Sequence, residues 1–312
     1  MKNELPQDYA VRAATLDDAQ AVTDLIIACD IEEFGRPEYG REDLLTMWRR
    51  KNFDLAQDAW VIFADDGTLV GYADMHYAGG LVRLNNNSCV HPAHKNRGVE
   101  EWMFERAEAW ARERVADAPI VIRHVINANA PLRVARMKRW GYDAVRQAWI
   151  MHIDLNEQPP APIIPDGIVV RAFERGRDEH DAWMCIQEAF RDLWQHQDVP
   201  YDEWASFVLE HKAFAAELSF LAFDDVEIVG AAITLNDELG GWVQQVAVRR
   251  PWRNRGIALA LLHSVFGELY KRGVADAGLE VDAESLTGAT RLYERAGMRV
   301  KNQFTEFRKT LE

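Results

Sequence analysis

The feature that most constrains this chain is that one order of sequence signals occurs twice, on the two sides of a proline-rich stretch. That stretch, "NEQPPAPIIPDG", covers residues 156–167 and holds four prolines within seven positions. Proline fixes φ and has no backbone N–H, so the segment can continue neither a helix nor a central strand. We therefore predict a stiff, extended connector between two folded regions.

The segments on each side of this connector match in order. "YAVRAATLDDAQAV" and "IVVRAFERGRDEHDAW" each indicate a short apolar strand followed by a helix, and hairpins with acidic turns follow at 65–67 and 224–225. Self-similarity at half the chain length predicts a duplicated domain of about 150 residues: 1–155, a linker at 156–167, and 168–312. Because strands and helices alternate, the predicted class is α/β (α+β) with a mixed sheet.

The bulk composition excludes several classes of function. A formal net charge of −14 argues against nucleic-acid and anionic-membrane partners, because phosphate-bearing surfaces are bound by basic proteins. No apolar run is long enough to span a membrane, and "MKNELPQDYA" lacks the apolar core of a signal peptide. Cys29, Cys89 and Cys185 are scattered, and the histidines have no ligand-like spacing. We therefore expect a reduced, cytoplasmic protein without a metal.

An arginine-rich turn opens the main helix of the second half. In "QQVAVRRPWRNRGIALALL", residues 244–262, a strand runs into a helix. The first N–H groups of a helix lack partners within the helix, and the peptide dipoles add positive charge there. Gly256 admits an anion to the backbone, Ala258 keeps the next turn slim, and Arg253 and Arg255 offer bidentate donors. We predict that the amides of 254–258 hold a pyrophosphate; a surface loop that only balances an acidic chain is the alternative.

This turn resembles a known family. "RNRGIA", residues 253–258, matches the (Q/R)xxGx(G/A) acetyl-CoA motif of the GNAT superfamily of N-acetyltransferases. "QVAVRRPW" is similar to the family's fourth strand and its turn. "LEVDAESLTGATRLYERAGM", residues 279–298, is similar to the fifth strand and the helix after it. The repeated order of elements extends the resemblance to the first half, as a tandem pair of GNAT domains.

The resemblance implies a fold, a cosubstrate and a reaction. Each domain is expected to be a mixed, mostly antiparallel sheet flanked by helices, with splayed parallel strands four and five. Acetyl-CoA is expected in that gap, with its pantetheine arm pairing along strand four. The reaction is acetyl transfer to a primary amine by direct attack in a ternary complex. The implied cofactor-binding set is Val246, Ala247, Val248, Arg253, Asn254, Arg255, Gly256, Ile257, Ala258 and Ser285.

The same resemblance assigns catalytic candidates. Tyr293 takes the place of the family's tyrosine, which protonates the departing thiolate; a core aromatic is the alternative. Strand four, "GWVQQVAV", carries no carboxylate to serve as a base. Glu280 and Asp282 alternate with apolar residues and are the candidate bases, unless they are only solvated surface carboxylates. Ser285 stands where the family often has asparagine, and it can still donate one hydrogen bond.

The first half is expected to be a degenerate, non-catalytic copy. When "VHPAHKNRGVE" is aligned with "VRRPWRNRGIA", Lys95 stands opposite Arg253 and Glu100 opposite Ala258. A carboxylate there satisfies the helix dipole and repels a pyrophosphate. Met137 stands opposite Tyr293, and a thioether cannot supply a proton. The consecutive asparagines at 85–87 are disfavoured inside a strand and predict an irregular edge.

The acceptor is expected to be a small-molecule or peptide amine. Two segments, "EEFGRPEYGREDLLTMWRR" and "DLWQHQDVPYDEWASFVLE", are rich in acids and aromatics and are predicted to line the two acceptor sides. That composition suits a cationic ligand and equally suits an ordinary solvated helix. The alternative function is a catalytically silent acyl-CoA-binding regulatory or scaffold protein. Two pseudo-twofold domains predict a monomer or a weak homodimer.

Overall fold

A computed structural model describes residues 4–78, 81–84, 88–114, 120–285 and 288–311. The chain forms two compact units. The first unit comprises residues 1–145 with 304–312, and the second comprises residues 146–303. The asparagines at 85–87 lie outside the described residues.

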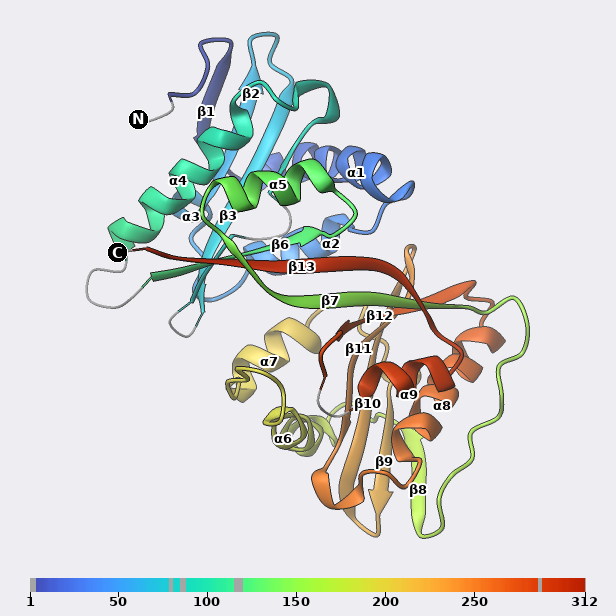
Figure 1. Ribbon diagram of the computed structural model, residues 1–312. Helices are drawn as coiled ribbons and strands as arrows, with labels where there is room; N and C mark the ends of the chain where they lie inside the picture. The colour runs from blue at the N-terminus through green and yellow to red at the C-terminus, as the bar shows by residue number, and fades with distance from the viewer. Residues whose placement is uncertain (1–3, 79–80, 85–87, 115–119, 286–287, 312) are drawn as a thin grey trace. The chain divides into compact units, whose positions relative to one another are not determined.

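The first unit is a mixed sheet with helices on both faces (Figure 1). Helices α1 and α2 pack on one face, and α4 and α5 pack on the other. Strand β4 is parallel to β6, and the other neighbouring strands are antiparallel. The strands are β1 (Tyr9–Ala13), β2 (Ala59–Ala64), β3 (Leu69–Ala78), β4 (Leu81–Leu84), β5 (Cys89–Val90), β6 (Ile120–Asn127) and the end of β13 (Arg299–Leu311). The helices are α1 (Ala19–Phe34), α2 (Arg41–Trp48), α3 (Leu55–Asp58), α4 (Val99–Arg114) and α5 (Pro131–Arg139).

The second unit repeats this arrangement. Helices α6 and α7 cover one face of its sheet, and α8 and α9 cover the other (Figure 1). Strand β11 is parallel to β12, and the other neighbouring strands are antiparallel. The strands are β8 (Ile168–Ala172), β9 (Phe220–Asp224), β10 (Glu227–Asp237), β11 (Gly240–Val248), β12 (Asp276–Asp282) and β7 (Asp143–Asp154). The helices are α6 (Glu179–Phe190), α7 (Tyr201–Val208), α8 (Ile257–Lys271) and α9 (Ala289–Arg295).

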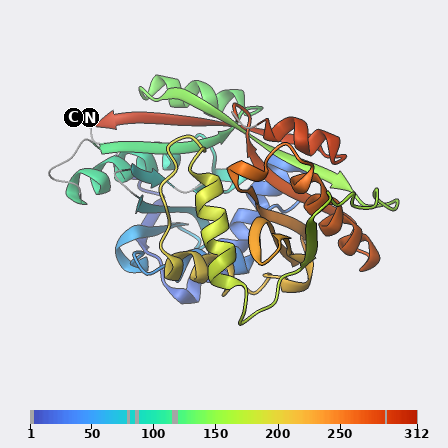
Figure 2. The same cartoon turned by 90° about the horizontal axis from the view of Figure 1, so that it is seen from below.

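The two halves of the chain exchange their last strands, which corrects the predicted domain boundaries. Strand β7 ends the first half, yet it pairs with β12 of the second unit, from Asp276↔Asp154 to Asp282↔Ala148. Strand β13 ends the second half and runs alongside β6 of the first unit (Figure 2). Neither 1–155 nor 168–312 therefore contains a complete sheet, although residues 156–167 form the irregular connector that the prolines predict.

An ion pair that occurs in both units shows the duplication at the level of side chains. Arg12 near the end of β1 donates to both carboxylate oxygens of Asp18, with N···O distances of 2.7 and 2.6 Å. Arg171 near the end of β8 binds Asp178 in the same bidentate way, at 2.6 and 2.8 Å. Each aspartate also accepts a backbone N–H, so the pair fixes the chain where it enters the first helix of its unit.

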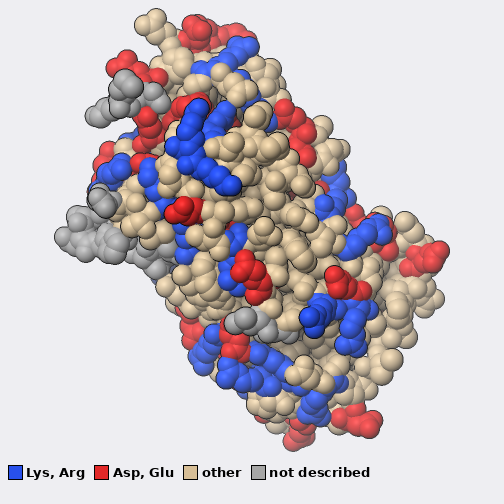
Figure 3. All heavy atoms as spheres, viewed as in Figure 1, with Lys and Arg blue, Asp and Glu red and all other residues tan. Residues whose placement is uncertain are grey.

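The surface carries both signs of charge. On the face shown in Figure 3, short groups of Lys and Arg side chains lie next to Asp and Glu side chains. Many of the arginines form ion pairs with carboxylates, and these include Arg249 and Arg250 of the arginine-rich turn. Arg249 binds Glu188 and Glu227, and Arg250 binds Asp192.

Candidate active site

Strands β11 and β12 separate after a short stretch of pairing. They share only the pairs Gly241↔Ala277 and Trp242↔Gly278. A β-bulge then interrupts β11, because Val243 pairs with Thr234 and Gln245 pairs with Ile233, which leaves Gln244 as the extra residue. Beyond Trp242, no described strand pairs with this edge of β11. This is the splay predicted for strands four and five.

The backbone groups of β11 that face the gap follow from its pairing with β10. The amide of Arg249 donates to the carbonyl of Val229 at 2.9 Å. Hydrogen-bonded residues alternate along an antiparallel ladder, so Ala247 and Gln245 also bond toward β10. The amides of Val246 and Val248 therefore point to the open edge. An unpaired edge of this kind accepts an extended, amide-bearing ligand as an added strand.

The turn at 254–258 leaves the start of α8 uncapped. Asn254 and Gly256 have positive φ values of 60° and 87°, which turn the chain sharply into the helix. No side chain caps the helix, and its first turn has no acidic residue. Arg255 is exposed, and within the described residues it forms no ion pair or hydrogen bond. The first amides of α8 and this guanidinium are thus available to an anion.

Arg253 forms contacts within the protein that the sequence did not predict. Its guanidinium forms an ion pair with Asp192, donates from Nη2 to the carbonyl of Ala189 at 2.9 Å, and donates from Nε to the carbonyl of Val248 at 3.0 Å. Lys95 in the first unit is paired in the same manner with Glu32. The side chain at this position therefore ties the turn to the end of the first helix of its unit. The contact of Arg253 with phosphate stays a prediction, and it would have to compete with Asp192 for the guanidinium.

Tyr293 lies on α9 inside the core of the second unit. Its side chain is 8% exposed and packs among residues of α8 and β12. Burial raises the pKa of Tyr293 to about 12, so the phenol is protonated at any physiological pH. Its hydroxyl forms no hydrogen bond to another described residue. A neutral phenol without an internal partner is suited to donate a proton.

The two candidate bases differ in their surroundings. Leu279 and Val281 are buried, whereas Glu280 is exposed, so the predicted alternation along β12 is confirmed. Asp282 accepts from Arg146 Nε at 2.9 Å and from Arg146 Nη2 at 2.6 Å. The Arg146 guanidinium stacks on Trp194, with its carbon 4.6 Å from the ring centroid. Arg146 therefore already engages the Asp282 carboxylate, and Asp282 and Glu280 both stay predicted bases.

Two further positions complete the site. Ser285 lies between β12 and α9, where its amide donates to the carbonyl of Asp282 at 3.1 Å. Gln245 was not predicted to be functional. Its side-chain oxygen accepts a hydrogen bond from Trp204 Nε1 at 2.9 Å, and Trp204 is 3% exposed. No sequence signal links these two residues, because they are 41 positions apart on different elements.

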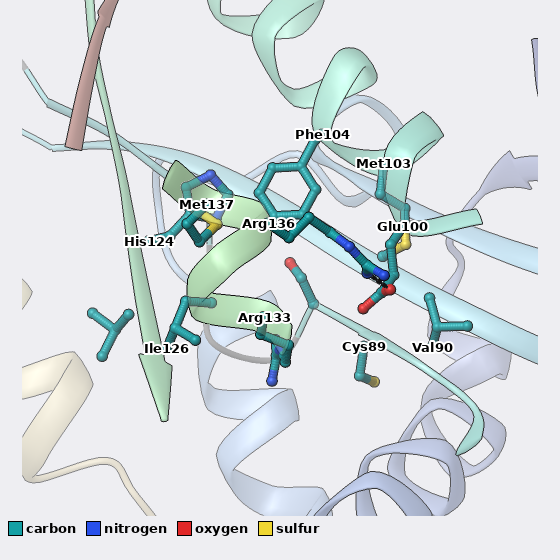
Figure 4. A pocket seen from close by; sticks show the side chains of 12 residues that line it. Cys89, Val90, Glu100, Met103, Phe104, His124, Ile126, Arg133, Arg136 and Met137 are labelled. Atoms are coloured by element: carbon teal, nitrogen blue, oxygen red, sulfur yellow. Dashed lines mark hydrogen bonds and ion pairs between the residues drawn. The ribbon is translucent and has the colours of Figure 1, made fainter. Parts of the chain in front are cut away.

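The first unit has the same turn with different side chains. Asn96 and Gly98 have φ values of 61° and 88°, nearly those of the second unit. Here, however, Arg136 of α5 reaches over the start of α4 and forms an ion pair with Glu100 (Figure 4). Arg136 also donates to Asn96 Oδ1 at 2.7 Å and lies 3.7 Å from Glu101. The protein's own side chains therefore occupy the place that is open at 254–258.

A small cavity lies beside this ion pair (Figure 4). Its volume of about 40 Å³ is room for about three water molecules. Phe104 and His124 line it, with their rings stacked at 4.7 Å between centroids. Burial lowers the pKa of His124 to about 3, so the imidazole is neutral. The lining also contains Glu100, Arg133 and Arg136, so the charged groups at this cavity include the ion pair that closes the turn.

Comparison with known proteins identifies the family. The family model of the acetyltransferase (GNAT) family matches residues 19–135 and 181–298. The first match lies within the first compact unit and the second match within the second, and together they cover more than half of the chain. The chain therefore belongs to the GNAT acetyltransferase family.

Individual relatives agree with this assignment. A mycothiol acetyltransferase of Salinispora tropica is 29% identical over 245 residues, covering 74% of this chain and 75% of that protein. A mycothiol acetyltransferase of Cellulomonas flavigena is 28% identical over 254 residues, covering 73% of this chain and 68% of that protein.

Two solved structures share the fold. A GCN5-related N-acetyltransferase from Sphaerobacter thermophilus has 37% identity and a TM-score of 0.83, covering 98% of this chain and 97% of that chain. A tandem GNAT protein from the clavulanic acid biosynthesis pathway has a TM-score of 0.76 at 15% identity, covering 97% of this chain and 98% of that chain. At that identity the second likeness shows the fold alone.

These findings make the chain an N-acetyltransferase, of a family that uses acetyl-CoA as cosubstrate. In the part of the chain that the structure describes, no group of three or more His, Cys, Asp or Glu side chains is arranged to hold a metal ion. No helix within the same residues is both long and apolar enough to cross a membrane.

Proposed function

We propose that the second unit transfers an acetyl group from acetyl-CoA to a primary amine by direct attack within a ternary complex. The observation that carries this proposal is the combination of the unpaired edge of β11 with the uncapped start of α8. One element offers amides to an extended arm, and the other offers amides to an anion.

The residues of this unit fit coenzyme A. The amides of 254–258 and the Arg255 guanidinium would hold its diphosphate, and the open edge at Val246 and Val248 would hold the pantetheine arm. Gly256 has a left-handed backbone conformation, which glycine adopts without strain and which a residue with a side chain rarely adopts. When bound, the cosubstrate supplies an activated acetyl thioester.

The protein's own groups supply the rest of the chemistry. The Val246 amide faces the gap and is the candidate donor to the thioester carbonyl oxygen. Tyr293 holds its proton at neutral pH and is the candidate donor to the thiolate of coenzyme A. Glu280 and Asp282 are the candidate bases, and either would act on the attacking amine, directly or through water.

We propose that the first unit is non-catalytic. Glu100 and Arg136 fill the place of an anion there, and Met137 stands where the second unit has Tyr293. The acceptor is proposed to be a small-molecule amine, because the relatives at 28–29% identity are named mycothiol acetyltransferases.

The test compares matched variants of the two units. Tyr293→Phe should lower kcat for coenzyme A release about 100-fold with an amine panel, because general-acid catalysis contributes about 10²- to 10⁴-fold. Acetyl-CoA affinity should stay within about twofold, since the hydroxyl acts on the departing thiolate. Met137→Leu, at the matching position of the first unit, should leave both quantities unchanged.

Calorimetry separates this proposal from its alternative. The chain should bind one acetyl-CoA, and a wild-type protein that binds it but turns over no amine would be the silent acyl-CoA-binding protein. A protein that binds no acetyl-CoA would refute the proposed site altogether.

A further inference from the structure

Gln245 is held in one orientation by a buried tryptophan. The indole N–H of Trp204 can only donate, so the group that faces it at 2.9 Å must be the side-chain oxygen of Gln245. The amide nitrogen must therefore point the other way. Its two N–H donors form no hydrogen bond with any residue that the structure describes.

Trp204 is itself firmly placed. Helix α7 begins after Val199 and Pro200, and Val199 is fixed by two hydrogen bonds to α6. Its carbonyl accepts from Trp183 Nε1 at 2.9 Å, and its amide donates to Gln187 Oε1 at 2.8 Å. Trp204 packs in the same core as α6 and is 3% exposed. The orientation of Gln245 is thus set before any ligand binds.

Gln245 lies on the face of the sheet opposite α8. Ala247 packs into the core beneath α6 and α7, whereas Val246 and Val248 pack toward α8. Gln245 shares the face of Ala247, and Glu280 and Asp282 face away from the α8 core along β12. Because the anion-binding turn belongs to α8, the proposed acceptor amine would arrive from the α6–α7 face, next to Gln245.

We infer that Gln245 is a specificity-determining residue, which selects acceptor amines that carry a carbonyl or another hydrogen-bond acceptor close to the amine. This inference rests on the proposed function and names the substrate class of that site. A glutamine in this orientation presents only donors to the cleft. It favours an amino amide over the amine that lacks the carboxamide group.

A single substitution at Gln245 replaces its N–H donors with an acceptor oxygen and keeps the hydrogen bond from Trp204. In Gln245→Glu the carboxylate still accepts from Trp204 Nε1, but it presents an acceptor oxygen to the cleft in place of the N–H donors. Gln244→Glu is the matched control, since it adds the same charge one position away, in the bulge. Thermal melting checks that both variants fold.

The probes are pairs of amines that differ by one carboxamide group next to the amine, such as phenylalaninamide and phenethylamine. Their affinities are measured by calorimetry with and without coenzyme A, so that the comparison does not need turnover. Wild-type protein should prefer the amide, and Gln245→Glu should reduce the ratio of the two affinities about tenfold. Gln244→Glu should leave the ratio within about twofold.

Trp204→Phe provides an independent check, because it frees the Gln245 amide to rotate. The preference should fall about threefold while acetyl-CoA affinity stays unchanged. A wild-type protein without preference for the amide, or a Gln245→Glu variant that changes both affinities by the same factor, would overturn the inference. A wild-type protein that does not bind acetyl-CoA would instead refute the proposed function. The amine affinities measured without coenzyme A would still decide the inference about Gln245.

Discussion

The turns at 96–100 and 254–258 have the same backbone and different side chains. Both follow a short 3₁₀ helix, both have an asparagine and a glycine with positive φ, and both enter a long helix. The helix start at 254–258 is uncapped, with Ala258 in its first turn. The start at 96–100 carries Glu100, which is neutralised by Arg136. The fold supplies the same helix-start backbone twice, and under the proposed function the side chains of Glu100 and Arg136 decide whether an anion can enter.

The units are alike in one respect, because each takes one strand from the other half of the chain. Each sheet is completed by a strand that the other half provides. Met151 and Ile153 of β7 are buried in the core of the second unit. We therefore expect the two halves to fold together, although the residues at their two turns differ.

The largest expected effect comes from separating the halves. A fragment of residues 168–312 lacks β7, and loss of buried side chains such as Met151 costs about 2–5 kcal/mol each. We expect no cooperative thermal transition by circular dichroism from this fragment alone. Adding the fragment 1–155 should restore the transition, and cleavage within 156–167 of the intact chain should preserve it. A monomeric, cooperatively melting 168–312 fragment would show that the exchange is dispensable.

The second prediction transfers the carboxylate of the first unit to the second. Ala258→Glu should weaken acetyl-CoA binding about 100-fold, because like charges brought together cost several kcal/mol. Ala258→Gln has the same shape without the charge and should weaken it about tenfold or less. Calorimetric titration measures both. Equal losses in the two variants would mean that size, rather than charge, closes the turn at 96–100.

The third prediction removes the ion pair of the first unit. Glu100→Ala leaves Arg136 half-buried without its main partner and should lower the free energy of unfolding by about 2 kcal/mol. The double variant Glu100→Ala/Arg136→Ala should cost less than the sum of the single changes, as measured by urea unfolding. Activity and the binding of one acetyl-CoA should persist. Additive costs would argue against a coupled pair.

The smallest effect concerns the ion pairs that both units keep. Hydrogen bonds from Arg12 hold the pKa of Asp18 below its ordinary value of 3.8. Burial alone would raise the pKa of Asp178. Hydrogen bonds from Arg171 and the Glu174 amide outweigh burial, so the pKa of Asp178 is also lowered. A lowered carboxyl pKa gives stability that is present above the unfolded value and is lost as pH falls through the folded value.

Asp18→Asn and Asp178→Asn should therefore each cost about 1–2 kcal/mol at pH 7. The cost should shrink as pH falls below about 4, because the carboxylates of the wild-type protein become protonated as pH falls toward their lowered folded pKa values. Unfolding by urea at several pH values measures this. A cost that does not change between pH 3 and pH 7 would assign the effect to packing instead of charge.

Much of this site could be predicted from residues that are neighbours in sequence. The periodicity of α8, the glycine at 256 and the strand before it follow from local propensities, and they place the anion-binding turn. The same holds for the proposal that the first unit is non-catalytic, because Glu100 and Met137 are visible in the alignment of the halves. The ion pair of Arg253 could not be predicted, since its partner Asp192 is 61 positions away.

The sequence by itself determined the duplication, the family and the turn, because those depend on short stretches whose dihedral angles and polarity are set by nearby residues. Only the tertiary structure decided which sheet β7 and β13 complete, which arginine remains open to an anion, and which way Gln245 points. Each of these depends on contacts between distant segments, such as Arg146 with Asp282, 136 positions apart. No local pattern encodes them, because strands of similar composition can pair with either sheet and an exposed arginine can take any nearby carboxylate.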